Sequence, residues 1–490
     1  MARQFTDGQI CMTMSMIMSM RGFLTSSIGA TSLGVTCAAA LALPSVLPAA
    51  AASVRAERTA ATGRVAKDAV PGSTQSLPLV PLTRERVLGT APEQGLYRVD
   101  VRHFSLVGVV WDDPDTELKG RVQIRNRSAA TGQWSGWQDV ETHNEDHGAD
   151  PGTAERAPGR VHGATAPLWV DDSDGVDVRV LAGSGTSAAP GAPDRRTGDP
   201  TPLPSGLRLE LVDPGDEPPA QGPPADVSGT AALTEATAAA YAANADLVPA
   251  GALEIPELSR EDTEQELIRL EGGVEAEGSV AGDAVRAKPY IGPRPRIVTR
   301  RGWGADESLR GGGFVYTKKI KAAFVHHTVS GNKYRCSQAA SVVRGIYRYH
   351  VKSMGWRDVG YNFLVDKCGT IYEGRAGGVA KPVKGAHTLG FNSNSMGIAV
   401  IGTYGSAKPS GAAVKAVARL AAWKLGLYGA NPRGKTYLKS GGGNLYPKGK
   451  NVRLNVISGH RDGFATSCPG KRLYAKLGTA RSSAARYQGR

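Results

Sequence analysis

The stretch FVHHTVS, residues 324–330, places two histidines side by side among residues that favour β-structure. Adjacent side chains of a strand point to opposite faces, so His326 and His327 cannot both readily serve one site. Ala323 and Val325 share a face with His327 and are typical of a packed core. We therefore expect His326 to lie on an open face and His327 to be a structural histidine.

A third histidine and a cysteine further along the chain complete a candidate set of metal ligands. His460 and Cys468 both lie in the motif SGHRDGFATSCPG. Hydrolytic zinc sites use three protein ligands and leave a fourth position for water, whose pKa the metal lowers while it also polarises a carbonyl. His326, His460 and Cys468 would supply two nitrogens and one sulfur. A buried free thiol is the alternative for Cys468, and spacing alone does not decide, because the two histidines are far apart in the sequence.

The cysteine count bears on the same question. The chain has five cysteines, at positions Cys11, Cys37, Cys336, Cys368 and Cys468. Removal of an N-terminal export signal would leave three, an odd number for an oxidising compartment. Cys336 and Cys368 flank one helix–turn–strand stretch and are the pair that we expect to form a disulfide. Cys468 is then left for another role.

The elements that must position these residues alternate between strand and helix patterns. We predict strands over 321–330, 395–404 and 455–464, two strands within 359–375 joined by a turn at 367–369, and helices over 337–354 and 410–429. Ser410 is the expected N-cap of the second helix. The pattern predicts an α/β domain over residues 296–480, with a mixed central sheet covered by helices.

The N-terminus has the features of an export signal. Arg21 is followed by a run without charge from Gly22 to Val54, which includes PAAAAS near its end. A basic flank, an apolar stretch and small residues predict a signal peptide over residues 1–52. A transmembrane anchor is the competing interpretation, but the Gly, Ser, Thr and Pro residues of the run make a poor membrane-spanning helix. We expect a secreted, cell-wall-associated protein with no stable membrane insertion.

Charge is distributed unevenly along the chain. Residues 291–490 carry about 35 Lys and Arg against about 6 Asp and Glu, out of totals of 59 and 45. A basic domain predicts a polyanionic partner, although solubility alone would also explain it. Since we expect export, anionic cell-wall polymers are the favoured partners and nucleic acid is not expected.

Three regions precede the C-terminal domain. Residues 53–94 are rich in Ala, Thr and Pro and are expected to be disordered. Residues 95–213 contain short alternating runs such as YRVDVRHF between turn residues, and predict an all-β, sandwich-like accessory domain. Residues 214–295 are acidic and rich in Ala and Pro, and predict a disordered linker with one helix around 259–273.

Five motifs of the C-terminal domain carry a family resemblance. They are RRGWGADE, FVHHTVS, MGWRDVGYNFLVDKCGTIYEGR, GAHTLGFNSNSMGIAVIGTY and SGHRDGFATSCPG, in this order over most of residues 298–475. With them the domain closely resembles the family of peptidoglycan recognition proteins and type-2 N-acetylmuramoyl-L-alanine amidases. The resemblance implies hydrolysis of the amide between the lactyl group of N-acetylmuramic acid and L-alanine.

The resemblance also implies roles for the candidate catalytic residues. His326, His460 and Cys468 correspond to the Zn²⁺ ligands of the family, and Tyr361 corresponds to the tyrosine that assists catalysis beside the metal. Thr466 stands where active members have Lys or Thr, and its hydroxyl can donate a hydrogen bond to the oxyanion. The general base is left open between Tyr361 and a relayed water.

Further residues are implied to contact the muropeptide. His387 and Asn392 resemble groove residues, and His350 is either a groove residue or a core histidine. Arg375 either binds a peptide carboxylate or pairs with an acid inside the domain.

Three functions remain to be separated at this point. The first is a monomeric zinc-dependent amidase that acts on peptidoglycan, and it is favoured because the chain keeps the full ligand set and the tyrosine. The second is a non-catalytic peptidoglycan-binding protein that uses the same groove, since many family members lack the cysteine ligand. The third is a wall-adhesion protein that binds through residues 95–213 alone.

Overall fold

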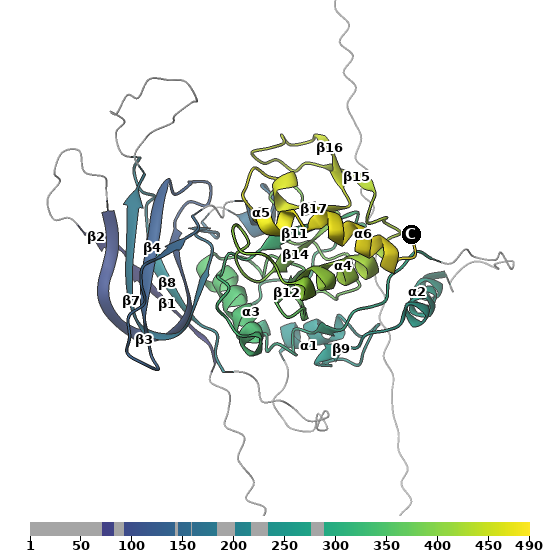
Figure 1. The fold of residues 1–490 in the computed structure, drawn as a ribbon, viewed down its shortest axis with the longest axis horizontal. Coiled ribbons are helices and arrows are strands. Elements are labelled where there is room, and N and C mark those ends of the chain that lie inside the picture. The colour runs from purple at the N-terminus through teal and green to yellow at the C-terminus, as the bar shows by residue number, and fades with distance from the viewer. Residues whose placement is uncertain are drawn as a thin grey trace, which may run out of the picture. The chain divides into compact units, whose positions relative to one another are not determined.

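The computed structural model describes residues 71–82, 93–142, 146–157, 159–183, 201–216, 234–275 and 289–490. The predicted signal peptide, most of the segment predicted to be disordered and parts of the predicted linker lie outside these residues. No helix in the described part of the chain is long and apolar enough to cross a membrane. An all-β domain and a mixed α/β domain are present (Figure 1), which confirms both predicted fold classes.

The accessory domain is built on one antiparallel sheet of eight strands. The order is β1-β8-β3-β7-β4-β5, and β2 and β6 also pair with β3. The long strands β3 and β7 pair with register shifts, and β3 is strongly curved in Figure 1. Buried apolar side chains of β3, β4, β7 and β8 form one core. The strands are β1 (Ser73–Pro78), β2 (Val80–Pro81), β3 (Glu93–Trp111), β4 (Gly120–Ser128), β5 (Gln138–Val140), β6 (Gly163–Ala164), β7 (Leu168–Ala182) and β8 (Arg208–Asp213).

Part of the segment predicted to be disordered is ordered. β1 pairs with β8 along its whole length, from Ser73 opposite Asp213 to Pro78 opposite Arg208. β1 is the edge strand of the sheet, and an edge strand tolerates a proline. The prediction failed here because the short polar strand is stabilised by a partner far away in the sequence.

The C-terminal domain is built on a mixed sheet of seven strands. Its order is β17-β11-β14-β12-β13-β10-β9, with β11 parallel to both β14 and β17. A separate hairpin is formed by β15 and β16. The elements are α1 (Glu235–Ala242), β9 (Glu254–Ile255), α2 (Arg260–Glu275), β10 (Ile297–Val298), β11 (Ala322–His327), α3 (Ala339–Arg348), β12 (Phe363–Val365), β13 (Ile371–Glu373), β14 (Ser395–Val400), α4 (Gly411–Gly426), β15 (Lys435–Lys439), β16 (Asn451–Asn455), β17 (Ile457–Gly459), α5 (Lys471–Tyr474) and α6 (Leu477–Tyr487).

Helices cover both faces of this sheet, as the sequence predicts. Ala323 and Val325 of β11 pack in one apolar core with side chains of α4 and α6. The other core is formed by α3 with sheet residues, and it also includes Leu106 and Val212 of the accessory domain. The two domains therefore share a continuous apolar contact at α3.

The region predicted to be a linker contributes to the C-terminal sheet. β9 pairs antiparallel with β10, so it extends the sheet at its edge. The Asn244 amide donates hydrogen bonds of 3.1 and 3.0 Å to the two carboxylate oxygens of Glu373. Of the elements in this region, α2 lies where the sequence predicts a helix, whereas the helix α1 and the strand β9 were not predicted. Both are short: β9 is held by its pairing with β10, and α1 by a neighbouring loop, where the Arg310 guanidinium donates to the Ala236 carbonyl at 3.3 Å.

Glu373 predicts a pH dependence of stability. Burial raises the pKa of Glu373 from an ordinary value of 4.5 to about 7. The folded chain then holds a proton that the unfolded chain releases, so this contribution to stability is present below pH 4.5 and is lost as the pH rises through about 7. In Glu373→Gln the loss is absent. The unfolding free energy of the variant relative to the parent should therefore rise by up to about 3 kcal/mol between about pH 5 and about pH 8, measured by urea titration. A pH-independent difference would contradict the assignment.

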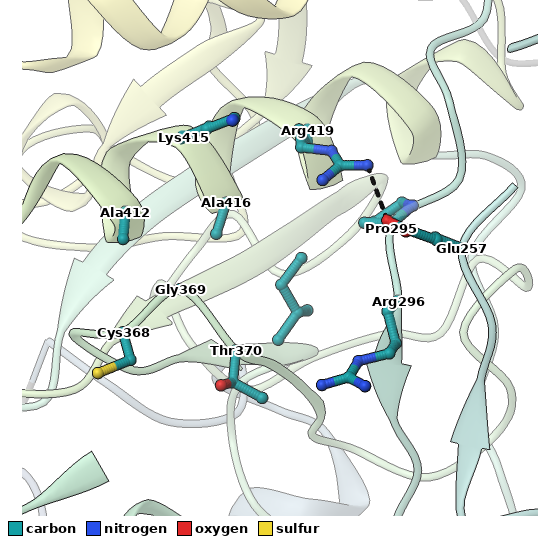
Figure 2. A pocket seen from close by; sticks show the side chains of 11 residues that line it. Glu257, Pro295, Arg296, Cys368, Gly369, Thr370, Ala412, Lys415, Ala416 and Arg419 are labelled. Atoms are coloured by element: carbon teal, nitrogen blue, oxygen red, sulfur yellow. Dashed lines mark hydrogen bonds and ion pairs between the residues drawn. The ribbon is translucent and has the colours of Figure 1, made fainter. Parts of the chain in front are cut away.

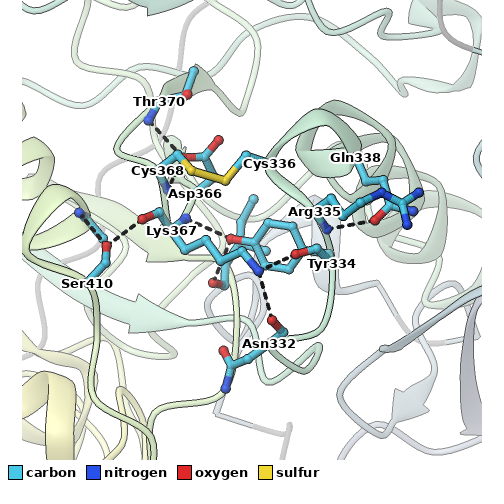
Figure 3. Close-up of a disulfide and its surroundings, with 12 residues drawn as sticks. Asn332, Tyr334, Arg335, Cys336, Gln338, Asp366, Lys367, Cys368, Thr370 and Ser410 are labelled. Carbon is cyan, nitrogen blue, oxygen red and sulfur yellow. Dashed lines mark hydrogen bonds between the residues drawn. A yellow bond between two sulfur atoms is a disulfide. The ribbon is translucent and has the colours of Figure 1, made fainter.

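The expected disulfide is present (Figure 3). Cys336 and Cys368 are bonded, and their bond ties the segment before α3 to the turn between β12 and β13. That turn is held by Asp366, whose carboxylate accepts hydrogen bonds of 2.9 Å from the backbone N–H groups of Cys368 and Thr370. Cys468 is a buried free cysteine.

Candidate metal centre

Four buried side chains bring metal-ligating atoms together. His147, His326, His460 and Cys468 each offer one ligand atom, and these atoms all lie within 4.8 Å of one another. The Cys468 Sγ lies 3.8 Å from His326 Nδ1. Three of the four are the ligands expected from the sequence. The fourth, His147, comes from the accessory domain and was not predicted.

The two histidines of the C-terminal domain converge because of the sheet topology. β11 and β17 are adjacent parallel strands, and Val325 lies opposite Gly459. His326 follows Val325 and His460 follows Gly459, so both side chains lie at the carboxyl ends of these two parallel strands. The loop after His460 returns Cys468 to these strand ends, where Arg461 N–H donates to the Cys468 carbonyl at 3.0 Å.

The face that carries His326 is covered. His326 is completely buried and His327 nearly so, with an exposed fraction of 4%. The expected open face is therefore absent. The expected division of the two faces of β11 is nevertheless found, because Ala323 and Val325 pack in the helix-covered core and only His326 joins the candidate ligand cluster. His327 Nδ1 instead accepts a hydrogen bond of 3.2 Å from the Tyr404 N–H.

Buried histidine nitrogens without hydrogen-bond partners indicate that the cluster can bind a metal. Both ring nitrogens of His460 and the Nε2 of His147 are buried without a hydrogen-bond partner among the described residues. Buried polar atoms rarely remain unpaired, because their desolvation is costly. His326 Nε2 lies 3.3 Å from His387 Nδ1, which leaves its Nδ1 directed toward Cys468. A set of imidazole and thiol donors suits Zn²⁺, so these residues fit the ion that the resemblance implies.

Burial also sets the protonation of the ligands. It lowers the pKa of His326 well below its ordinary value and that of His460 to about 3, so both rings are neutral and able to bind a metal. Burial raises the pKa of the Cys468 thiol, so metal binding there would release its proton. The Asp146 carboxyl keeps a lowered pKa despite its burial, because His147 and His460 lie beside it.

Tyr361 and Thr466 both lie beside the cluster. The Tyr361 ring centroid is 5.5 Å from that of His326, and burial raises the pKa of its phenol well above the ordinary value. Tyr361 is therefore a hydrogen-bond donor at neutral pH. The Thr466 hydroxyl accepts a hydrogen bond of 3.1 Å from the Cys468 N–H.

The residues expected to contact a muropeptide are all buried. His350 Nδ1 accepts a hydrogen bond of 3.2 Å from the Gly360 N–H, and its ring packs on Trp356. His387 contacts His326, as described above. Asn392 accepts the backbone N–H of His387 at 2.7 Å. His350 thus has the environment of a core histidine, one of the two alternatives that the sequence left open, while His387 supports the candidate ligand His326.

A separate pocket lies away from these side chains (Figure 2). Its volume is about 330 Å³, and none of the four candidate ligands lines it. Its basic side chains are Arg296, Lys415 and Arg419, of which Arg419 forms an ion pair of 3.2 Å with Glu257. The pocket therefore contributes nothing to the candidate metal centre.

Family models match both halves of the chain. The model for N-acetylmuramoyl-L-alanine amidase matches residues 316–471. The model described as Rv3811 N-terminal galactose-binding domain-like matches residues 52–201.

Individual relatives match part of the chain. The chain is 35% identical over 128 residues to peptidoglycan-recognition protein SA of Drosophila melanogaster, which is 26% of this chain and 60% of that protein. It is 33% identical over 193 residues to human N-acetylmuramoyl-L-alanine amidase, which is 38% of this chain and 28% of that protein. A solved structure of peptidoglycan recognition protein LE in complex with tracheal cytotoxin matches with 27% identity and a TM-score of 0.30, over 37% of this chain and 92% of that one.

A further relative is covered over most of its length. Peptidoglycan-recognition protein 1 of Holotrichia diomphalia is 32% identical over 199 residues, which is 40% of this chain and 84% of that protein. The chain therefore belongs to the family of peptidoglycan recognition proteins and N-acetylmuramoyl-L-alanine amidases.

Proposed function

We propose that the chain is a secreted, zinc-dependent N-acetylmuramoyl-L-alanine amidase that cleaves the amide between the lactyl group and L-alanine in peptidoglycan. The observation that carries the proposal is the buried cluster of His326, His460 and Cys468, with Tyr361 beside it. Zinc held by these residues would supply a Lewis acid and an activated water. A binding protein would not need the free thiol.

The residues of the chain would perform the remaining tasks. His387 fixes the orientation of the His326 ring through the contact of 3.3 Å between their nitrogens. The Tyr361 phenol keeps its proton and can donate a hydrogen bond to the oxyanion that develops on the scissile carbonyl.

The proposal is tested by metal content and by the new amino groups that hydrolysis exposes. The full chain should hold one zinc per molecule and release stem peptides that begin with L-alanine from purified sacculi. Cys468→Ser should release none, because it lacks the sulfur ligand. If neither the zinc-loaded parent nor the zinc-loaded His147→Ala variant releases L-alanine amino groups, the chain is a binding protein and not an amidase.

Tyr361→Phe is expected to lower kcat by about 10²-fold while leaving the zinc content unchanged, because one oxyanion donor is removed. KM should change little, since the donor acts mainly in the transition state. The matched control is Tyr404→Phe, which removes a hydroxyl that donates to the Ile401 carbonyl at 2.8 Å. That control should lose about 1 kcal/mol of stability and keep its kcat. An equal kcat in both variants would remove Tyr361 from the mechanism.

A further inference from the structure

A segment of the accessory domain, residues 146–156, lies directly against the metal centre. The His147 ring centroid is 4.6 Å from that of His460, 5.3 Å from that of His326 and 5.7 Å from that of Tyr361. His147 Nδ1 lies 2.8 Å from the Asp146 carboxylate, while its Nε2 has no hydrogen-bond partner among the described residues. A ligating histidine commonly hydrogen bonds a carboxylate through its second nitrogen, and His147 has this arrangement.

The backbone at the start of the 146–156 segment is hydrogen-bonded to the C-terminal domain. The Gly148 N–H donates to the Ala386 carbonyl at 3.2 Å, and the Leu389 N–H donates to the Asp146 carbonyl at 3.0 Å. The Asn392 amide donates to the Gly148 carbonyl at 2.9 Å. Asn392 is one of the residues implied to contact the muropeptide, so the segment occupies a place where we expect substrate.

The carboxylates of the segment are bound as well. The Asp150 carboxylate accepts hydrogen bonds from the Gly390 N–H at 2.9 Å and from the Asn392 amide at 2.8 Å, and lies 3.2 Å from Lys384 Nζ. Glu155 forms a bidentate pair with Arg375, at 2.9 and 2.7 Å. Both side chains of that pair are about nine-tenths buried. The sequence suggested that Arg375 binds a peptide carboxylate or an internal acid, and here the acid belongs to the accessory domain.

We propose that His147 is a fourth zinc ligand and that the 146–156 segment fills the substrate groove, so that the chain is largely latent: only the small fraction of molecules in which this segment is displaced is active. The proposal rests on the proposed function for the identity of the metal and of the groove. With His147 bound, no position is left for the water that hydrolysis needs. The amides and carboxylates of the segment are the same groups that a stem peptide presents.

The 146–156 segment can block the groove even if its contacts with the groove are individually weak, because it is part of the same chain. An attached segment competes with substrate at an effective concentration on the order of millimolar. The apparent affinity for substrate is then the intrinsic affinity multiplied by the fraction of molecules in which the groove is accessible. A wall fragment that binds the groove, or a change in the accessory domain that withdraws the segment, would shift the same equilibrium.

The first test uses the full chain loaded with Co²⁺, whose visible absorption reports the ligands. His147→Ala should change the spectrum, allow azide to bind the metal and weaken metal affinity by at least about tenfold. The matched control is His103→Ala, which alters an exposed histidine of the same domain that pairs with Asp172. It should leave the spectrum and the metal affinity as they are. A His147→Ala protein with the spectrum and affinity of the parent would overturn the ligand assignment.

The second test loosens the segment without altering a candidate ligand. Glu155→Gln removes the charge that pairs with Arg375 and should raise the rate of hydrolysis of sacculi by about tenfold. A parent chain as active as Glu155→Gln and His147→Ala would refute latency and leave the proposed function intact. If His147→Ala changes the Co²⁺ spectrum but no variant releases L-alanine amino groups, His147 is confirmed as a ligand and the proposed function is wrong.

Discussion

His326→Ala is expected to remove the zinc site and to lower hydrolysis of sacculi by at least roughly 10³-fold, since the metal supplies both the nucleophile and the polarisation of the carbonyl. His326 is the candidate ligand whose Nδ1 lies 3.8 Å from the Cys468 Sγ. Without it, the cluster keeps His147, His460 and Cys468 as donors but loses one of the two candidate ligands that β11 and β17 position side by side, so zinc affinity should fall steeply. Zinc per chain is measured by atomic emission, and rates are compared in the parent and in the Glu155→Gln background.

The neighbouring histidine provides the matched control. His327→Ala removes an acceptor for the buried Tyr404 N–H but no member of the ligand cluster. It should therefore lose about 1–3 kcal/mol of stability and keep one zinc per chain. The two variants differ by one position in the sequence and by one face of a strand. If His327→Ala loses zinc while His326→Ala keeps it, the assignment of the faces is wrong.

The alternation of side chains along a strand is sufficient to distinguish these two histidines from the sequence. It works because the pleat of β11 directs Ala323 and Val325 toward α4, and this places His326 on the opposite side. The convergence of His326 with His460 needed the additional fact that β11 and β17 are parallel neighbours. Strand order is decided by packing over long sequence distances, so local pattern could only suggest it.

His147 could not be found in this way. It lies in a loop of the accessory domain, and its site is completed by side chains of another domain. Neither periodicity nor spacing connects loops of two domains. The available signal was compositional: the polar sequence ETHNEDHGAD contains two histidines and four acidic residues, a concentration of possible ligands in a domain otherwise rich in strands.

The groove residues show a related limit. The sequence placed His350 on a helical face and His387 in a motif, and neither signal separates a side chain that touches substrate from one that supports its neighbour. In the structure His387 contacts His326, and His350 accepts the Gly360 N–H next to Tyr361. Both positions stabilise catalytic candidates, which is a sufficient reason for a histidine at each of them.

A second large effect is expected at Arg300, which opens the motif RRGWGADE. Its guanidinium donates to the Glu307 carboxylate at 2.6 Å and to the Asp358 carboxylate at 3.0 Å, and all three side chains are buried. Asp358 in turn accepts the Val359 N–H at 2.7 Å and the Ala376 N–H at 2.9 Å. Val359 and Ala376 are close in sequence to Tyr361 and Arg375, so the charge network helps to hold the segments that carry these two residues.

Arg300→Met should therefore lower the free energy of unfolding by about 3–5 kcal/mol, because the buried Asp358 loses its ion-pair partner and Glu307 keeps only Arg310, at 3.3 Å. The matched control is Arg296→Met, which breaks an exposed ion pair with Glu254 and should cost less than about 1 kcal/mol. Adding Glu307→Gln to Arg300→Met should recover part of the loss, since there is then one buried carboxylate fewer beside Arg310, the remaining cation. Urea titrations of the three variants measure these differences. Equal losses in Arg300→Met and Arg296→Met would mean that water reaches the network and that it does not hold the Tyr361 segment in place.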